Sequence, residues 1–216
     1  MGLPMKLLNL FFCWAFFYEI YLPDEKDFII MARITFIIGG ARSGKSAFAE
    51  ALAKKHNAVI YIATAEARDD EMRERIQTHR SRRPSHWKTI ESPYSVDNVV
   101  SEQNGQAGLI FIDCITLYIT NMLLKNETAS IAAGSDFHVK IQNQEQILEE
   151  INKLTRACSE SSSDIIIVSN EVGLGIVPDN ALSRMFRDIA GCANQIIADE
   201  ADEVYFIVAG IAQRIK

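Results

Sequence analysis

The chain has 216 residues, with 22 Lys or Arg against 28 Asp or Glu, and its net charge near neutral pH is −6. A chain of this length fills one α/β domain and is short for two. The acidic balance argues against general nucleic-acid affinity, because a protein that binds the phosphate backbone normally carries positive charge on the surface that meets it, so we expect small-molecule partners and no nucleic acid.

The cysteines favour reduced thiols over a zinc site or a disulfide. None of them stands in C-x-x-C spacing, and Cys114 lies at the end of an apolar run. Unpaired cysteines are typical of the reducing cytoplasm, which is where we expect this protein. The four cysteines are Cys13, Cys114, Cys158 and Cys192.

The first thirty residues differ in character from the rest and are rich in Phe, Leu, Trp and Tyr. Their uncharged run, residues 7–18, is shorter than the roughly 20 residues of a spanning helix, so we expect no stable membrane span. Lys6 precedes this run as in a signal peptide, but no small-residue cleavage site follows. We expect residues 1–30 to be an extension outside a catalytic domain of residues 31–216, with membrane attachment or an interface patch as the alternatives.

The strongest motif in the chain is a phosphate-binding loop. The β-branched run 34–38 predicts a strand, and the residues from Lys45 onward predict a helix. Between them, Gly39, Gly44, Lys45 and Ser46 match G-x-x-x-x-G-K-[ST], in which glycines let the backbone N–H groups wrap an anion. The predicted nucleotide-binding residues of the loop are Gly39, Gly40, Ala41, Arg42, Ser43, Gly44, Lys45 and Ser46.

This loop predicts the binding of a nucleoside triphosphate, GTP or ATP. The helix N-terminus adds unpaired N–H groups and the positive end of its dipole. Lys45 is the expected catalytic contact to the β- and γ-phosphates, and the Ser46 hydroxyl is an expected Mg²⁺ ligand. A coincidental glycine turn is the alternative, which the strand before the loop and the helix after it argue against.

A buried strand and a basic helix follow. Residues 58–63 (AVIYIA) form a continuous apolar run of strand length, as in a parallel strand covered on both faces. Acidic residues at 69–71 begin the next helix and arginines crowd its middle and end, which suits the helix dipole. Pro84 ends this helix.

A second nucleotide motif ends the apolar run 109–113 (LIFID). In such motifs the carboxylate at the end of the strand holds Mg²⁺, so Asp113 is the predicted metal carboxylate, with a plain strand-end cap as the alternative. Residues 114–124 continue as a helix. The polar stretch 126–136 predicts a surface loop, and the apolar spacing of residues 137–158 predicts a long amphipathic helix.

Two further apolar strands, 164–169 and 204–208, complete an alternation of strands with helices. The sequence therefore predicts an α/β P-loop nucleotide-binding fold of the RecA-like kind, with a mainly parallel sheet flanked by helices. Ligands of such sheets lie at the carboxyl ends of the strands. We expect Gly39, Asp113 and Asn170 to share that edge.

The segment after the 164–169 strand is suited to hold a substrate. Asn170 and Glu171 lie at the strand end, glycines follow, Pro178 is expected to open a helix, and Arg187 lies along that helix. Polar groups beside a nucleotide loop are well placed to bind a second substrate. The alternative makes Arg187 and Asp188 a structural pair.

Several long motifs now coincide with one known family. GGARSGKS, YIATAEARDDEMRERIQTHRSRRPSHW, NEVGLGIVP and FRDIAGCANQIIADEADEVYFIVAGI resemble the bifunctional adenosylcobinamide kinase/adenosylcobinamide-phosphate guanylyltransferases of cobalamin synthesis, from about residue 31 to residue 216. The resemblance implies two reactions. A nucleoside triphosphate phosphorylates adenosylcobinamide, and GTP then passes GMP through a histidine to adenosylcobinamide phosphate, giving adenosylcobinamide-GDP. It also implies a homo-oligomer.

The second reaction requires a nucleophile. A neutral imidazole can attack the α-phosphorus of GTP and form a phosphoramidate. Among the four histidines, His79 lies in the basic helix and matches the guanylylated histidine of the family. Arg75 precedes it by one turn, and Arg82 and Arg83 follow it by about one turn, so these guanidiniums are expected to screen the triphosphate charge. His86, in the turn after Pro84, is the alternative nucleophile.

The chain departs from the family pattern at two places. Thr78 stands beside His79 where some relatives carry two adjacent histidines, and Cys192 replaces a usual basic residue. Two other functions stay open on the residues alone. One is a single-activity small-molecule kinase without a covalent histidine, and the other is a nucleotide-gated regulatory module.

Overall fold

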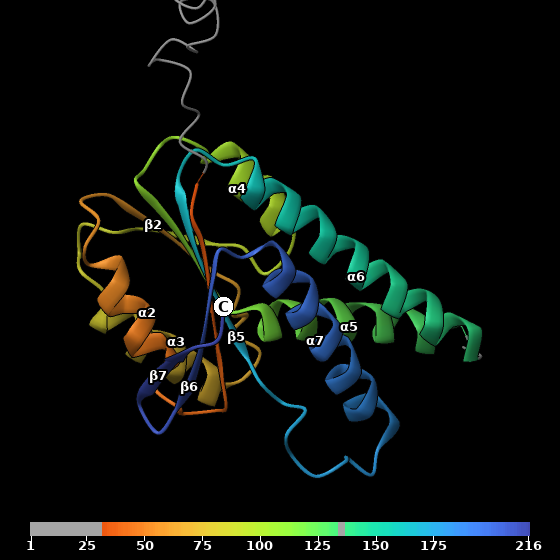
Figure 1. Cartoon of the computed structure of the whole chain (residues 1–216). Helices are drawn as coiled ribbons and strands as arrows, with labels where there is room; N and C mark the ends of the chain where they lie inside the picture. Colours follow the sequence, from red (N-terminus) through yellow and green to blue (C-terminus); the bar gives the residue numbers. More distant parts are fainter. Residues whose placement is uncertain (1–31, 134–136) are drawn as a thin grey trace, which may run out of the picture. The chain divides into compact units, whose positions relative to one another are not determined.

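A computed structural model describes residues 32–133 and 137–216, which form a seven-stranded sheet covered by helices on both faces (Figure 1). The strand order is β3-β2-β4-β5-β1-β6-β7. All neighbouring strands pair in parallel except β6 and β7, which pair antiparallel. The strands are β1 Ile34–Gly39, β2 Val59–Ala63, β3 Lys88–Glu91, β4 Leu109–Asp113, β5 Asp164–Asn170, β6 Glu203–Val208 and β7 Ile211–Arg214.

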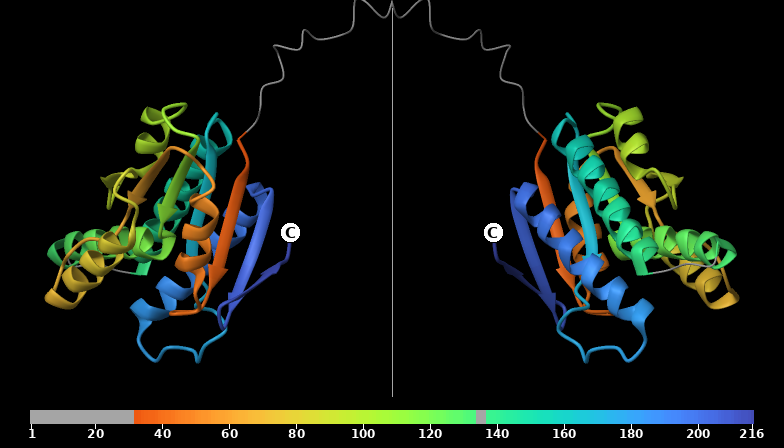
Figure 2. Two further views of the ribbon diagram at one scale, coloured as in Figure 1. Left: turned by 90° about the vertical axis from the view of Figure 1, so that its left-hand side faces the viewer. Right: turned by 90° about the vertical axis from the view of Figure 1, so that its right-hand side faces the viewer.

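The helices lie in two layers. Buried side chains of α4 to α7 share one core cluster with the sheet, and α2 contributes Ala49 and Ala53 to the cluster on the opposite face. α3 lies on the same side as α2 (Figures 1 and 2). The helices are α2 Lys45–Ala53, α3 Asp70–Arg82, α4 Val96–Glu102, α5 Ile115–Ala133, α6 Phe137–Ser159 and α7 Ala181–Glu200. Among the described residues, no helix is both long and apolar enough to cross a bilayer.

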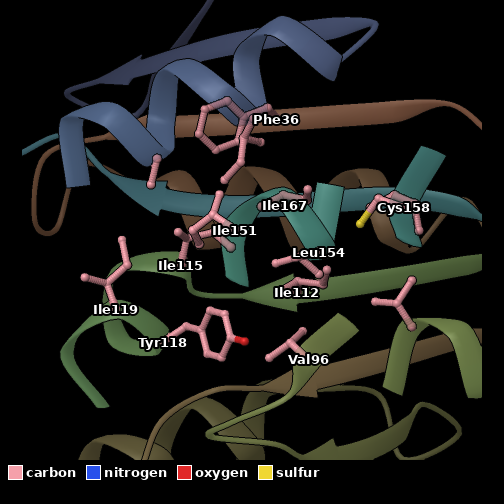
Figure 3. Close-up of a cluster of buried hydrophobic side chains, with 14 of the residues drawn as sticks. Phe36, Val96, Ile112, Ile115, Tyr118, Ile119, Ile151, Leu154, Cys158 and Ile167 are labelled. Carbon is pink, nitrogen blue, oxygen red and sulfur yellow. The ribbon is translucent and has the colours of Figure 1, made fainter. Parts of the chain in front are cut away.

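The strands are apolar throughout because both faces of the sheet are covered. Successive residues of a strand point to opposite faces. Phe36 therefore packs with the α4–α7 layer, whereas its neighbour Ile37 packs with the α2 layer. Figure 3 shows Phe36, Ile112 and Ile167 of three strands in the first of these clusters, facing Ile151 of α6. This accounts for continuous apolar runs where a one-sided sheet would alternate.

The strand order confirms the predicted fold class and places the motifs. β5 lies between β1, which leads into the phosphate loop, and β4, which ends in Asp113. In the parallel registers Gly39 lies opposite Asn170, and Ala63 lies opposite Asp113. The carboxyl ends of β1, β2, β4 and β5 thus meet at one edge, as predicted.

The loop predicted for residues 126–136 is wrong over most of its length, because α5 continues to Ala133. Three of the eight residues from Asn126 to Ala133 are alanine and one is glutamate, which are strong helix formers, so helix propensity outweighed the Ser and Asn content that suggested a loop. Residues 134–136 lie outside the described part of the chain.

The predicted start of α7 at Pro178 is also wrong. Pro178 lies before the helix, which begins at Ala181 and is capped by Asn180, whose side-chain oxygen accepts from the Ser183 N–H at 2.8 Å. A side-chain acceptor at this position satisfies one of the free N–H groups of the first turn. The predicted extension, residues 1–30, lies outside the described residues and stays a prediction.

Candidate nucleotide site

The phosphate loop joins β1 to α2 and is shaped by two glycines. A Cβ at Gly39 would lie 2.5 Å from the Ile207 carbonyl oxygen and 2.7 Å from Ser43 Oγ, so only glycine lets β1 pass this close to β6. Gly44 has φ +99° and Arg42 has φ 57°, both in the left-handed region. Glycine adopts this region without strain, and the resulting turn directs N–H groups inward.

Lys45 is the first residue of α2 and is 9% exposed. Its Nζ donates to the Gly40 carbonyl at 3.2 Å, which folds the side chain back over the loop. Burial lowers the pKa of Lys45, and the nearby Cys114 and Asp113 oppose that effect. No acidic residue occupies the first turn of α2, and no side chain caps it. The free N–H groups and a desolvated ammonium together form an anion site.

Asp113 ends β4 and is held by Tyr61 of β2. The Tyr61 hydroxyl donates to Asp113 Oδ2 at 2.6 Å. Burial, and next the Asp113 charge, raise the pKa of Tyr61 well above its ordinary value, so the hydroxyl stays a donor over the physiological range. The next residue, Cys114, donates its N–H to Thr64 Oγ1 at 2.8 Å, and the peptide bond between Asp113 and Cys114 is cis. These contacts fix the carboxylate relative to both strands.

One cavity of about 560 Å³ opens beside the loop. It brings together predicted residues from four segments: Lys45 of α2, His79 of α3, Asp113 at the end of β4 and Asn170 at the end of β5. Of the loop residues, those from Ala41 to Ser46 line it, whereas Gly39 and Gly40 support the turn. No hydrogen bond or ion pair to a described residue engages the His79 ring, so both ring nitrogens are available for chemistry.

The residues around the cavity suit a bound triphosphate with Mg²⁺. Ser46 and Asp113 both line the cavity and offer the hard oxygen donors that Mg²⁺ takes beside phosphate oxygens. Ser43 Oγ is buried and has no partner among the described residues, as expected of a hydroxyl that awaits a phosphate oxygen. The described residues contain no cluster of three or more His, Cys, Asp or Glu suited to hold a metal without substrate.

The predicted substrate-binding residues Asn170, Glu171 and Arg187 differ in whether they line the cavity. Asn170 lines the cavity, and its amide donates to Thr116 Oγ1 at 2.7 Å. Glu171 accepts from the Gly173 N–H, and Arg187 pairs with Asp188 at 3.4 Å, as in the structural alternative. Neither Glu171 nor Arg187 is among the cavity-lining residues. The side chains of Arg75 and Arg82 lie outside what the structure describes.

Tyr61 lines the cavity and was missed as a site residue by sequence reasoning. Tyr61 was assigned to a buried strand, whereas Arg83 was expected, with Arg75 and Arg82, to screen the triphosphate charge. The guanidinium carbon of Arg83 lies 3.5 Å from the centroid of the Tyr61 ring, and both residues line the cavity. The available signal was the hydroxyl of a tyrosine inside the run AVIYIA, since a buried phenol requires a hydrogen-bond partner.

Comparison with known proteins identifies relatives along most of the chain. The family model described as cobinamide kinase / cobinamide phosphate guanyltransferase matches residues 35–215. The bifunctional adenosylcobalamin biosynthesis protein CobU of Salmonella typhimurium is 42% identical over 180 residues, covering 83% of this chain and 98% of the relative. CobU of Escherichia coli is 40% identical with the same coverage, and CobP of Pseudomonas aeruginosa is 41% identical over 83% of this chain and 95% of its own.

The solved structures give a weaker likeness. A KaiC-like protein from Pyrococcus horikoshii superposes with a TM-score of 0.41 at 14% identity, covering 82% of this chain and 71% of that chain.

Proposed function

This chain belongs to the family of cobinamide kinases and cobinamide phosphate guanyltransferases, and we propose that a single cavity beside its phosphate loop serves both reactions. The chain is a transferase of cobalamin biosynthesis that acts on adenosylcobinamide and its phosphate with nucleotide substrates. The observation that supports one shared cavity is that Lys45 of the phosphate loop and His79 of α3 line the same space.

In the kinase reaction the phosphate loop seats GTP or ATP. The aminopropanol hydroxyl of adenosylcobinamide attacks the γ-phosphorus, its oxygen bonds to phosphorus, and the bond from phosphorus to the β–γ bridging oxygen breaks. Lys45 and the N–H groups of the α2 N-terminus neutralise the charge that develops on the nucleoside diphosphate. Ser46 and Asp113 are the residues that would hold Mg²⁺, and the ion would supply positive charge to the phosphates.

In the guanylyltransferase reaction His79 is the nucleophile. A neutral ring nitrogen bonds to the α-phosphorus of GTP while the bond to the α–β bridging oxygen breaks, so pyrophosphate leaves and a guanylyl-histidine remains. A phosphate oxygen of adenosylcobinamide phosphate then attacks that phosphorus. The P–N bond breaks, adenosylcobinamide-GDP forms, and the imidazole is regenerated.

The remaining assignments are also proposals. Asn170, Glu171 and Arg187 contact the corrinoid substrate, and Arg75 and Arg82 contact the triphosphate. The cytoplasmic location follows from the cysteine pattern. Homo-oligomer formation is a proposal that the exposed apolar side chains support, because apolar side chains that gather on a surface mark interaction sites. These exposed side chains are Leu174, Ile176, Val177, Val208, Ile211 and Ile215.

The test is incubation with Mg²⁺ and GTP labelled at the α-phosphate, followed by denaturation. We expect label that is acid-labile and alkali-stable, as a phosphoramidate is. His79→Ala abolishes it and keeps phosphorylation of adenosylcobinamide by GTP or ATP.

His86→Ala is the matched control, because His86 is exposed and does not line the cavity. This variant should label as the unchanged protein does. A protein that phosphorylates adenosylcobinamide but never carries label would be a kinase alone, and label lost in His86→Ala but kept in His79→Ala would move the nucleophile.

A further inference from the structure

Arg83 is a cation in the cavity without an anionic partner among the residues whose side chains are described. It follows the last residue of α3, one helical turn after His79. Its Nε is buried and makes no hydrogen bond. A guanidinium normally engages carboxylates or phosphates through its donors, so one that lines a nucleotide cavity without such a partner is available to a ligand.

The stacking partner of Arg83 holds it in place. The guanidinium lies over the face of Tyr61, which is 3% exposed. The ring of Tyr61 packs against Phe111 in an edge arrangement, with centroids 4.9 Å apart and an interplanar angle of 69°. A cation over an aromatic face is attracted electrostatically, and a buried ring fixes where the cation sits. Arg83 is thus anchored to β2 although its own backbone belongs to the end of α3.

The same tyrosine also fixes the carboxylate of the magnesium motif. Its hydroxyl donates to Asp113 Oδ2, while its ring face carries Arg83. One rigid side chain therefore sets the positions of two groups of opposite charge that both line the cavity. His79 and Lys45 line the space that these groups share.

Other arginines around α3 are differently placed. Arg80 is 70% exposed and pairs with Glu91 at 3.8 Å, Arg73 pairs with Asp70, and Arg68 pairs with Glu66 at 2.7 Å. None of these three lines the cavity. Among the arginines of α3 and its C-cap whose side chains are described, Arg83 is the one that lines the cavity, is partly buried, is stacked on a ring and has no carboxylate partner.

We propose that Arg83 is a catalytic residue of guanylyl transfer, which binds the phosphates of GTP beside His79, and that Tyr61 is a positioning residue that holds both Arg83 and Asp113. The inference rests on the proposed function of His79. As the imidazole bonds to the α-phosphorus, the departing pyrophosphate gains negative charge, and a fixed guanidinium stabilises that charge. Lys45, at the start of α2, supplies the corresponding charge for the terminal phosphate.

The test compares initial rates of protein labelling by α-labelled GTP with rates of phosphorylation of adenosylcobinamide. Arg83→Met keeps the packing of the aliphatic stem and removes the charge, and we expect guanylylation to fall about 10²- to 10³-fold, as for loss of one transition-state donor. The kinase rate should change by roughly threefold or less, because its charge develops at the β–γ bridge, where Lys45 and the N–H groups of the α2 N-terminus neutralise it. Arg83→Lys restores part of the guanylylation.

Arg80→Met is the matched control, since it removes an arginine from the same helix outside the cavity. Its two rates should equal those of the unchanged protein. Thermal unfolding of each variant establishes that the fold is kept.

Tyr61 is tested by separating its two contacts. Tyr61→Phe keeps the ring under Arg83 and removes the hydroxyl, so both reactions should require more Mg²⁺ for half-maximal rate while the Arg83-dependent step persists. Tyr61→Leu removes both contacts, and adding Arg83→Met to it should slow guanylylation little further, because the two residues act as a unit.

The outcomes distinguish this inference from the proposed function. If the unchanged protein is never guanylylated, the proposed function fails and Arg83 has no such step to serve. If His79 is guanylylated and Arg83→Met labels at the unchanged rate, or loses both activities equally, Arg83 is not the guanylyl-transfer cation. Additive effects of Tyr61→Leu and Arg83→Met would exclude the positioning role.

Discussion

Individual side chains of the phosphate loop are set by contacts that the motif alone does not reveal. Gly39 and Gly40 are adjacent and both belong to the predicted nucleotide-binding set. An added Cβ at Gly39 would meet the Ile207 carbonyl at 2.5 Å, whereas one at Gly40 would meet nothing within 4 Å. The requirement for glycine at Gly39 is therefore steric and comes from the neighbouring strand β6.

We expect Gly39→Ala to lower the free energy of unfolding by about 1–3 kcal/mol, the range for overpacking a closed site. For a domain of this size that corresponds to a fall of roughly 2–12 °C in Tm. Gly40→Ala is the control and should leave Tm within about 2 °C, because its Cβ points into open space. Equal losses in the two variants would refute the steric explanation.

A second residue-scale effect concerns pH and lies far from the cavity. Cys158, near the end of α6, is fully buried in the core cluster, and burial raises its pKa from an ordinary value of 9.0 to about 12. Between pH 9 and 12 the unfolded thiol loses its proton while the folded thiol keeps it. The folded state then binds more protons, so stability falls as pH rises, by up to about 1.4 kcal/mol per pH unit.

Cys158→Ala removes this dependence. The variant should be less stable than the unchanged protein at pH 7, because of the space left in the core, and the difference should shrink above pH 9. Denaturant unfolding at intervals from pH 7 to pH 11 measures both curves. Curves that stay parallel over this range would contradict the assigned burial effect.

Sequence reasoning predicted the residues of the motifs but missed Tyr61, which contacts Asp113 and Arg83 and holds them in place. Lys45 and Asp113 were predicted because nucleotide motifs place those residue types there, and His79 was predicted because it matches the guanylylated histidine of the family that the chain resembles. Tyr61 was hidden because an aromatic residue in an apolar strand is usually core. Its role depends on Asp113 in the neighbouring strand and on Arg83 after α3, and such pairings arise only from tertiary packing.

Among the secondary-structure elements, those with buried side chains were predicted from the sequence and the exposed or short ones were missed. The run LIFID matched β4 at Leu109–Asp113 because both of its faces are covered. β3 and β7 were missed because they are edge strands of four residues with largely exposed, mixed side chains. α4 has seven residues, too few for a helical period to stand out. The end of α5 was missed because its residues are polar enough to resemble a loop.

α3 is the element that carries His79, and it is weakly held. None of its described side chains is buried, whereas α7 buries Ile189, Ala190 and Ile197 among others. Local opening costs little where few apolar contacts must be broken. Its N-cap, Asp69, accepts from the Met72 N–H at 2.7 Å and is one of its few fixed contacts.

We therefore expect amide hydrogens in the middle of α3 to exchange with solvent faster than those in the middle of α7. Hydrogen exchange followed by mass spectrometry of peptides from the two helices measures the difference. Mg²⁺ and GTP should slow exchange in α3, because the proposed site joins α3 to the phosphate loop. Protection of α3 equal to that of α7 without nucleotide would contradict this account of its packing.

At the scale of the whole described domain, parallel pairing explains why one edge holds the chemistry. Lys45, His79, Asp113 and Asn170 follow four different strands, β1, β2, β4 and β5, which point the same way. Residues more than a hundred positions apart therefore line one cavity. The alternation of strands and helices was sufficient to predict this convergence, but the position of β5 between β1 and β4 was visible only in the structure.

The central claim is that one cavity passes GMP to the corrinoid through the protein itself. The most direct measurement is a chase: the protein is loaded with GTP labelled at the α-phosphate, freed of nucleotide, and mixed with adenosylcobinamide phosphate. We predict that label stays on His79 until the chase and then leaves in equal amount as adenosylcobinamide-GDP. Product formed from GTP by a protein that never carries label, or label that the corrinoid phosphate cannot remove, would contradict the claim.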